Sequence, residues 1–466
     1  MGGPTVSDTG SRVRGDVRVV DVYGTLPAKV RGRIDALGRE HWRRAHAGVP
    51  RPADSWCPTR PLMLDADAFA LVGAVADRAA GLVLEACRRR ASTAGELLDA
   101  LSMPLSQFPL LDPAEPLTER LLTSVRADVM VERGVPRVVE LNIDGAIGGA
   151  IEADLVAGQF QEVYAGPAAS GPEPSGSPLR TPPSAVDAFF TELVAFLGLA
   201  EGDCLVVPVF REDGHDHLAD PDDFIAFLAP MAERGKAHGI TVVGYPLDGL
   251  TLDDRQRLRA GEHVARGVFR LFLPVEQAGP GLDALGAALR AGTARMYTPE
   301  ATSPVSDKRV LAWLWQDLGL LGADDRDFVR RHVPHTVIAG EGALDGDRAS
   351  LVLKPGDGYG GAGVTLGRSV GEEEWRELVL AAAGTGDHIL QRVVEADLVT
   401  FDFAHGTTGE IRSAAVPCVL GPMVYGRGLS GIYVRHGTPR PGVLVNTHQG
   451  AASNSVLIAK SPTAGR

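Results

Sequence analysis

Residues 351–364 read LVLKPGDGYGGAGV, and three of these glycines have the G-x-G-x-x-G spacing of a dinucleotide-binding loop. That fingerprint requires a strand before the glycines and a helix after them, because the helix N-terminus must meet the pyrophosphate. Residues 350–353 have the composition of a strand, but 364–366 read as a second short strand, and the next helical pattern begins near Glu372. The sequence therefore predicts a glycine-rich hairpin in place of a strand-to-helix turn.

Lys354 lies at the end of the apolar run that leads into these glycines. Burial of an ammonium group in such a run is unfavourable unless the group reaches water or an anion. Lysine is also rare in this chain, which uses arginine at nearly every other basic position. Of the 46 basic residues, five are lysines: Lys29, Lys236, Lys308, Lys354 and Lys460. We therefore expect Lys354 and its hairpin to hold a ligand that carries phosphate groups.

The composition is that of a globular protein with two or three domains. The chain has 466 residues, of which 44% are hydrophobic and 23% charged, and its formal net charge is −13. This charge argues against nucleic acid or an anionic membrane as a partner but leaves room for one basic pocket that binds a small anion. The amino terminus lacks the apolar core of a signal peptide, and charged residues interrupt the apolar segment 68–87, so we predict a soluble cytoplasmic protein.

The four cysteines are scattered without a C-x-x-C pair, which argues against a zinc site and a disulfide scaffold. They are Cys57, Cys87, Cys204 and Cys418. We expect buried free thiols.

The hydrophobic pattern divides the chain into four parts. Residues 1–165 mix helical and extended patterns, and 166–185 read as a linker rich in Pro, Gly and Ser. Residues 186–300 alternate strands with helices, which predicts a parallel sheet, and strands dominate the later part of 301–466. The strands expected in the third part are 204–210, 240–246 and 264–273, and its later helices are 221–238 and 252–260.

The segment RADVMVERGVPRVVELNIDG, residues 126–145, predicts a β-hairpin that turns near Gly134. A register symmetric about Gly134 places Asp128 opposite Glu140 and Arg126 opposite Asn142, on one face. Two facing carboxylates repel each other, so the pair needs a cation. Oxygen ligands of this kind suit Mg²⁺ shared with phosphate oxygens, and Arg126 could hold a terminal phosphate. The alternative is a polar, solvent-facing surface.

A helix is expected over SDKRVLAWLWQDL, residues 306–318, with Ser306 or Asp307 as its N-cap. Lys308 and Arg309 then fall in the first turn, where the helix dipole disfavours cations. The two side chains either meet a bound anion or extend into water.

Other segments carry weaker signals. HILQRVVEAD, residues 388–397, is either a strand whose exit could meet a purine edge or an ordinary buried strand, and Arg435 and Asn446 are polar residues of strand-like runs. The segment His215–Asp216–His217 is more often a polar loop than a metal site. The P-loop, α/β-hydrolase and zincin signatures are missing.

Taken in chain order, RADVMVERGVPRVVELNIDG, SDKRVLAWLW, LKPGDGYGGAGV, HILQRVV, GIYVR and LVNTHQGA resemble the circularly permuted ATP-grasp proteins. The synthetase domain of glutathionylspermidine synthetases is similar. The resemblance spans about residues 120–455. It implies an α/β and α+β chain with a circularly permuted ATP-grasp fold. The metal-binding half would lie at about 120–160, a pre-ATP-grasp α/β domain at 186–300, and the nucleotide-binding subdomains at 301–466.

The resemblance also implies roles for individual residues, with ATP and Mg²⁺ as cofactors. The implied Mg²⁺ ligands are Asp128, Glu140 and Asn142. The implied catalytic residues are Arg126, Lys354 and Arg435. The implied nucleotide-binding residues are Lys308, Lys354, Gly358, Gly360, Gly361, Gly363, Gln391, Val393, Val394 and Glu395.

The expected function is that of an ATP-dependent ligase which joins a small-molecule carboxylate to an amine through an acyl phosphate and releases ADP and phosphate. A phosphotransferase with the same nucleotide clamp is the main alternative. A nicotinamide dehydrogenase and a nucleotide-binding protein without catalysis are further alternatives. The sequence identifies neither the acid nor the amine.

Overall fold

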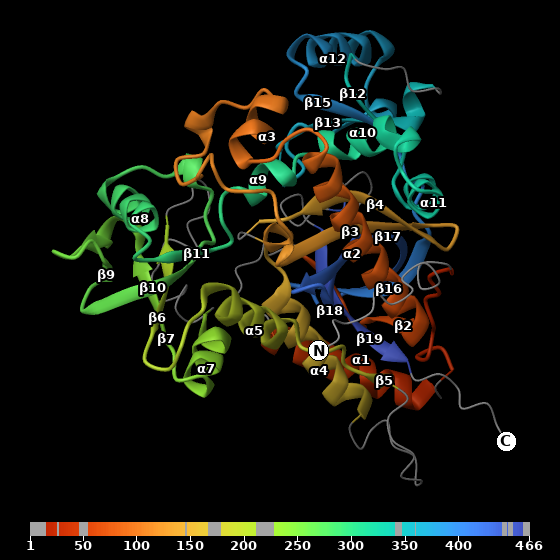
Figure 1. The fold of residues 1–466 in the computed structure, drawn as a ribbon. Helices are drawn as coiled ribbons and strands as arrows, with labels where there is room; N and C mark the ends of the chain where they lie inside the picture. Colours follow the sequence, from red (N-terminus) through yellow and green to blue (C-terminus); the bar gives the residue numbers. More distant parts are fainter. Residues whose placement is uncertain are drawn as a thin grey trace, which may run out of the picture.

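The computed structural model describes most of the chain. The described residues are 15–25, 28–45, 55–144, 147–165, 179–210, 228–340, 347–358, 360–439, 445 and 451–459. Three sheets organise them, with a nine-stranded sheet at the centre, a six-stranded sheet at one side and a four-stranded sheet at one end (Figure 1). The segment His215–Asp216–His217 and Asn446 lie outside the described residues.

The central sheet combines strands from the two ends of the described sequence. Its main path is β1 (Trp56–Pro58), β16 (Leu398–His405), β17 (Ile411–Tyr425), β18 (Gly428–His436), β19 (Ala452–Ala459) and β2 (Leu62–Asp65). Three strands lie off this path, namely β3 (Ser124–Glu132), β4 (Val135–Asn142) and β5 (Leu179–Arg180). Strand β3 pairs with both β17 and β4. All of these pairings are antiparallel except that of β19 with β2.

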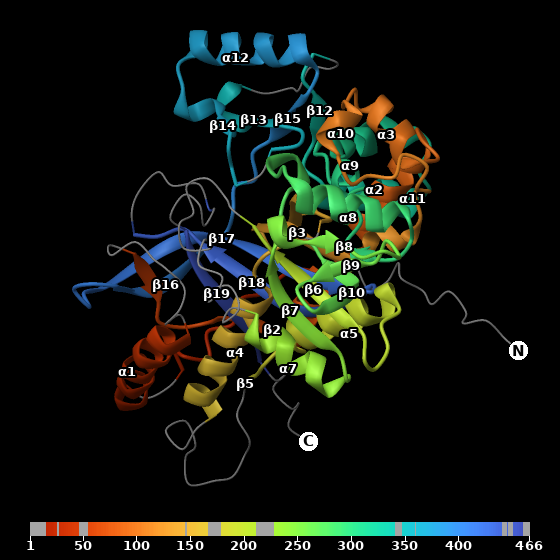
Figure 2. The same ribbon diagram turned by 90° about the vertical axis from the view of Figure 1, so that its left-hand side faces the viewer.

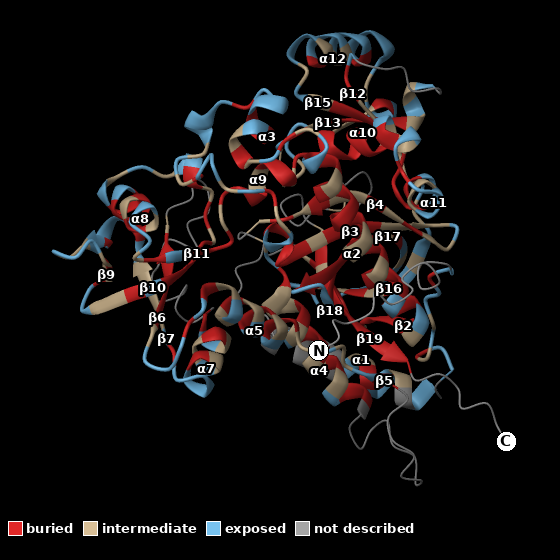
Figure 3. Ribbon diagram, viewed as in Figure 1, coloured by how far each residue is buried: buried red, intermediate tan, exposed pale blue. Residues whose placement is uncertain are grey.

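Helices cover both faces of the central sheet. On one face lies α2 (Ala66–Arg88), whose first turn is capped by the Asp65 side chain accepting from Ala68 N at 2.7 Å. Its many small side chains pack closely against alternate residues of β3, β17 and β18. On the other face lie α1 (Ala28–Ala45), α4 (Ala150–Ala165) and α5 (Ala185–Leu197). Buried residues accordingly concentrate in the central strands and α2 (Figure 3).

The six-stranded sheet forms an α/β unit between residues 204 and 297. Four of its strands are parallel, in the order β7 (Thr241–Pro246), β6 (Cys204–Val209), β10 (His263–Phe269) and β11 (Arg295–Tyr297). Helices α7 (Ala229–Ala237) and α8 (Pro280–Arg290) belong to this unit. The predicted strands are therefore found, and part of the predicted helix 221–238 is found as α7.

The helix predicted at 252–260 is wrong. This segment forms two short antiparallel strands, β8 (Thr251–Leu252) and β9 (Leu258–Ala260). The Asp253 side chain accepts hydrogen bonds from the backbone N–H groups of Arg255 and Arg257, both at 2.9 Å, and Gln256 has a φ of 59°. An aspartate that bonds its own following backbone in this way favours a turn over a helix.

The linker prediction is wrong at its carboxyl end. Residues 166–178 lie outside the described part of the chain, but Leu179–Arg180 form β5 beside β19. Ser184 then caps α5 by accepting from Asp187 N at 3.0 Å. The Pro- and Ser-rich composition that indicates a linker also supplies a helix cap.

The four-stranded sheet has the order β12 (Thr336–Ile338), β15 (His388–Arg392), β13 (Leu351–Pro355) and β14 (Thr365–Leu366). Strands β13 and β14 pair antiparallel across the glycines, and α12 (Glu372–Thr385) begins only later, so the predicted glycine-rich hairpin is confirmed. Helix α12 lies outermost on this sheet (Figure 2). The remaining helices are α3 (Ala94–Ala100), α9 (Thr302–Val305), α10 (Arg309–Gln316) and α11 (Ala323–His332).

Two further expectations concern the cysteines and membranes. The structure describes all four cysteines, and each thiol is buried and forms no disulfide bond, as predicted. Among the described helices, we find none with an apolar stretch long enough to cross a membrane.

Candidate active site

The β3–β4 hairpin brings the predicted metal ligands to one face of the central sheet. Its two-residue turn consists of Arg133 and Gly134, with φ values of 52° and 78°, the positive values that type I′ hairpin turns require. The predicted pairs are confirmed, since Asp128 lies opposite Glu140 and Arg126 lies opposite Asn142.

A β-bulge makes this register possible. Near the turn the pairs are Met130 with Arg137 and Val129 with Val138, and the register shifts by one residue before Asp128. The extra residue is Val139. If the ladder continued without a bulge, Val139 would lie opposite Asp128 and Glu140 opposite Ala127, on the face that packs against α2, because successive side chains alternate between faces. The bulge therefore turns Glu140 and Asn142 toward Asp128.

Asp128 is held by two arginines and one amide. Its Oδ1 lies 2.6 Å from Arg435 Nη2 and 3.5 Å from Arg126 Nε, and it accepts from Asn142 Nδ2 at 3.3 Å. Burial disfavours the charged carboxylate, but the two guanidinium groups outweigh burial and hold the pKa of Asp128 below its usual value. Asp128 is therefore a carboxylate at neutral pH, in a setting with more positive than negative charge.

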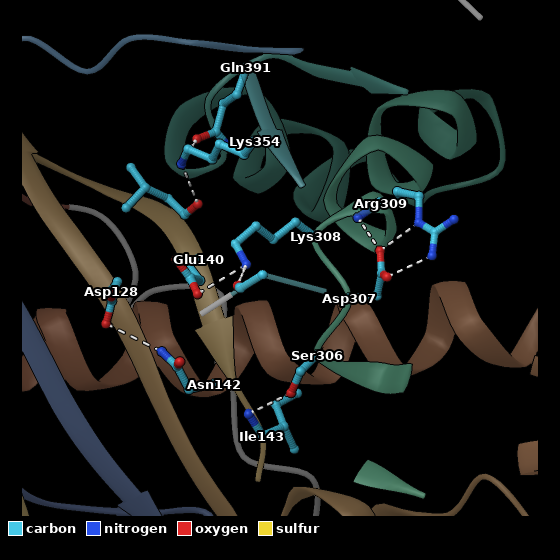
Figure 4. A network of polar contacts seen from close by, with 12 residues as sticks. Asp128, Glu140, Asn142, Ile143, Ser306, Asp307, Lys308, Arg309, Lys354 and Gln391 are labelled. Atoms are coloured by element: carbon cyan, nitrogen blue, oxygen red, sulfur yellow. Dashed lines mark hydrogen bonds and ion pairs between the residues drawn. The ribbon is translucent and has the colours of Figure 1, made fainter. Parts of the chain in front are cut away.

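Lys308 joins β4 to the glycine hairpin (Figure 4). Its Nζ lies 3.3 Å from Glu140 Oε1 and donates to the carbonyl oxygen of Gly358. The side chain is buried, so of the two alternatives the one in which Lys308 extends into water does not hold. The Glu140 and Asp128 side chains therefore lie on the same side of the hairpin and line the same cavity.

The predicted capping residue Asp307 bonds the start of the following helix. Helix α10 begins at Arg309 with Lys308 in the cap position, and Asp307 Oδ1 accepts from Arg309 N at 2.8 Å. Ser306 Oγ instead accepts from Ile143 N at 2.7 Å. Asp307 accepts from Arg309 Nε at 2.9 Å and Nη2 at 2.8 Å, so Arg309 is buried against a carboxylate and is not directed at water or a ligand.

Lys354 extends from the end of β13 into the space above the hairpin. Its Nζ donates to Gln391 Oε1 at 2.7 Å and to the carbonyl oxygen of Val139, the bulged residue, at 3.3 Å. Burial lowers the pKa of Lys354 to about 8, with the Glu140 charge acting in the opposite direction. Within the described part of the chain, no carboxylate bonds this ammonium group directly, so it is available to an anion.

The glycine hairpin covers one side of the same space. Gly360, Gly361 and Gly363 have φ values of 63°, 78° and 71°, the left-handed region that side chains rarely adopt. Backbone N–H groups in such a loop can approach phosphate oxygens closely, because no Cβ intervenes.

The end of β15 and the residues that follow it form the third wall of the space. Gln391 is buried, and besides holding Lys354 it donates from Nε2 to Thr336 Oγ1 at 3.1 Å. Val393 N donates to Ser350 O at 2.9 Å, and the exposed Glu395 pairs with Arg368 at 3.0 Å. The Gln391 side chain therefore positions a lysine, a role that the sequence did not indicate.

These walls enclose a cavity of about 1040 Å³ between the central and four-stranded sheets. This volume lies at the upper end of the range for small-molecule sites. Of the predicted residues, the cavity is lined by Arg126, Asp128, Glu140, Asn142, Lys354, Gly360, Gly361, Gln391, Val393, Val394, Glu395 and Arg435. Beside the cavity, Lys308 donates to the carbonyl oxygen of Gly358 and pairs with Glu140, and Gly363 is outside the lining.

The donor set at the hairpin fits a magnesium ion that is shared with a ligand. Among the described residues, there is no cluster of three or more His, Cys, Asp and Glu side chains that could enclose a metal. Mg²⁺ is usually bound by one or two carboxylates together with substrate phosphates and water. Asp128, Glu140 and the Asn142 amide supply such a partial set, and Lys354 faces it across the cavity.

Sequence reasoning missed the contacts that hold the hairpin in place. Asp397 accepts from the backbone N–H groups of both turn residues, Arg133 and Gly134, at 2.8 Å each. Asp397 N donates to Val131 O at 2.7 Å, so β16 continues where β3 ends. The acidic exit of HILQRVVEAD was the available signal, because an Asp before a strand commonly bonds backbone N–H groups.

Comparison with known proteins supports this architecture. No protein-family model matches the chain. A curated relative is the ATP-grasp enzyme ankG of Aspergillus thermomutatus, which is 33% identical over 94 residues, covering 16% of this chain and 19% of that enzyme. A solved structure, a glutathione synthetase like-effector (GSS30) from Globodera pallida in apoform, matches with a TM-score of 0.57 and 14% identity over 95% of this chain and 100% of that one. The chain therefore has a mixed α/β fold like that of a glutathione synthetase-like protein.

Proposed function

We propose that this protein is an ATP-dependent carboxylate–amine ligase with a circularly permuted ATP-grasp arrangement. The observation that carries the proposal is the cavity in which Asp128, Glu140 and Asn142 of one hairpin face Lys354 of the glycine-rich hairpin. The name of the curated relative and the fold of the structural neighbour support it. The permutation rests on chain order, since the hairpin with the metal ligands precedes the glycine hairpin.

ATP would bind with its phosphates between the two hairpins. Lys354, Lys308, Arg126 and Arg435 are four cations around two carboxylates, and this excess of positive charge suits a triphosphate. The segment 391–395 would lie beside the adenine. Asp128, Glu140 and Asn142 would hold Mg²⁺, which supplies charge neutralisation to the phosphate oxygens when bound.

The reaction would proceed in two displacements. A carboxylate oxygen of the acid attacks the γ-phosphorus, the bond to the β-phosphate oxygen breaks, and ADP leaves. The free amine then attacks the acyl carbon, phosphate leaves, and the nitrogen loses one proton to give the amide. Lys354 and the arginines would stabilise negative charge on the transferred group, so the chain contributes position and electrostatics and no covalent nucleophile.

The glycine hairpin would exclude water from the acyl phosphate. Lys308 links Gly358 of this hairpin to Glu140. A loop with several left-handed glycines can shift without side-chain clashes, and closure over the nucleotide protects a hydrolysable intermediate.

The decisive experiment is ADP release with Mg-ATP over a panel of small acids and amines, with mass spectrometry of the products. We expect one pair to stimulate ADP release and to yield its amide. Asp128→Ala should abolish turnover, whereas Asp325→Ala, which removes a carboxylate paired with Arg78 away from the cavity, should not. ADP release that needs an acceptor but no amine would identify a phosphotransferase. ATP binding without any turnover would contradict both.

A further inference from the structure

The carboxyl end of β10 in the α/β unit lies beside the chain segment that follows β4. In this sheet β7 and β10, which both follow β6 in the chain, lie on opposite sides of β6, and ligands of open α/β sheets gather at the carboxyl ends of strands where this happens. Arg270 directly follows β10 at this position and is fully buried. Its Nη1 donates to Phe272 O at 2.9 Å.

The carboxylate that Arg270 meets comes from the chain segment after β4. Arg270 Nη2 lies 3.0 Å from each oxygen of Asp144, which is two residues beyond Asn142. Ser303 of α9 donates to Asp144 Oδ2 at 2.8 Å. Asp144 is therefore held by a cation from the α/β unit and a hydroxyl from α9.

Ile143, the residue before Asp144, is held as well. Ser306 Oγ accepts from Ile143 N at 2.7 Å (Figure 4), so consecutive residues after β4 are fixed by two serines that flank the end of α9. Among the described strands, β4 pairs with β3 alone. An edge strand of this kind depends on contacts at its end to keep its last side chains in position.

Glu300 is a buried acid near Arg270, but it does not take the place of Asp144 as the partner of Arg270. Glu300 accepts from Leu110 N at 2.7 Å, and burial raises the pKa of Glu300 to about 7, although the Arg270 charge lowers it. The protonated carboxyl does not compete for the guanidinium group. The guanidinium group of Arg270 is paired with Asp144, while Glu300 accepts from a backbone N–H group.

We propose that Asp144 is a positioning residue which, gripped by Arg270 and Ser303, fixes Glu140 and Asn142 in the geometry that Mg²⁺ requires. The inference rests on the proposed function. Mg²⁺ demands nearly ideal octahedral geometry and short ligand distances, so small displacements at the end of β4 weaken its binding. Residues that orient metal ligands commonly change metal affinity 10–100-fold when altered. The α/β unit thereby acts on the metal site without touching it.

The test separates binding of Mg²⁺ from binding of ATP. Nucleotide affinity is measured by calorimetry with the full chain, once with excess Mg²⁺ and once with EDTA, and Mg²⁺ is then titrated at saturating ATP. Asp144→Asn and Ser303→Ala should raise the Mg²⁺ concentration for half-saturation by about 10-fold. They should change the affinity for metal-free ATP less than twofold. Arg270→Lys, which keeps the charge but loses the paired contact, should fall between wild type and Asp144→Asn.

A matched control is Asp317→Asn. Asp317 is a buried carboxylate that also pairs with arginines, Arg89 at 2.6 Å and Arg90 at 2.9 Å, and it lies outside the cavity lining. It should lower the melting temperature without changing the Mg²⁺ titration. If Ser303→Ala and Asp144→Asn behaved like this control, or weakened metal-free and Mg-ATP binding equally, the positioning role would be overturned. If ATP binding by the wild type did not respond to Mg²⁺ at all, this result would contradict the proposed function itself and not only the positioning role of Asp144.

Discussion

Replacing Lys354 with methionine separates the effect of this side chain on stability from its effect on ligand binding. Burial lowers the pKa of Lys354 from 10.5 to about 8, a difference that corresponds to about 3 kcal/mol against the charged form at neutral pH. Methionine has a similar length and no charge. It leaves Gln391 Oε1 without its donor, which offsets about 1–2 kcal/mol of the gain. We therefore expect unliganded Lys354→Met to be about 1–2 kcal/mol more stable than wild type at pH 7.

The pH dependence of this gain has a definite sign. Between about pH 8 and 10.5 the folded protein has released the Lys354 proton while the unfolded chain still binds it, so wild-type stability rises with pH across this window. The methionine variant lacks that rise, and its advantage should disappear. Urea denaturation at pH 7 and pH 10 measures both differences. Lys236→Met is the matched control, because this lysine is exposed and pairs only with Glu233.

Ligand binding should change in the opposite direction. A hydrogen bond to a charged group contributes about 1.5–3 kcal/mol, so Mg-ATP should bind Lys354→Met about 10–150-fold more weakly, measured by calorimetry. Thermal stabilisation by Mg-ATP should shrink accordingly. The reasoning is refuted if the unliganded variant is several kcal/mol less stable than wild type at pH 7, or if Mg-ATP stabilises both proteins equally.

Three other predictions test separate features. Deleting Val139 removes the bulge but leaves Glu140 opposite Asp128, so Mg²⁺-dependent ATP binding should be retained in calorimetry, whereas deleting Val138 and Val139 together pairs Glu140 with Val129 on the α2 side and should abolish that binding. Gly356→Ala places a Cβ 2.7 Å from Asp307 Oδ1 and should destabilise the protein by at least about 3 kcal/mol in urea denaturation, whereas Gly384→Ala, with open space around it, should not destabilise it. Burial raises the Glu300 pKa from 4.5 to about 7, so wild-type stability should decline as pH rises through this range, and Glu300→Gln should remove the decline.

Local patterns made part of the site predictable. The alternation of residues 125–143 gives the β3–β4 hairpin, and the glycine spacing with no helix behind it gives the β13–β14 hairpin. The register at Asp128 followed from an assumed symmetry about Gly134. The actual turn is centred between Arg133 and Gly134, and the bulge at Val139 restores the predicted pairing.

Contacts between distant segments could not be predicted in the same way. Nothing in the local sequence indicates that Arg270 meets Asp144, or that Asp397 binds the turn of the β3–β4 hairpin. The first turn of α10 shows the same limit. Its two cations looked misplaced against the helix dipole, but Glu140 of β4 neutralises Lys308, and Asp307, two residues earlier in the chain, neutralises Arg309.

The composition of the central sheet sets an order of events during folding. Strands β3 and β4 can pair as soon as both exist, but the Arg435 that neutralises Asp128 belongs to β18, near the other end of the described sequence. Until β17 and β18 are added, the hairpin exposes an apolar face and an edge. Pairing over such long sequence separations closes slowly and leaves edges open to aggregation. A nascent chain of this protein therefore completes its ligand-binding face late, when strands from both ends of the described sequence have joined.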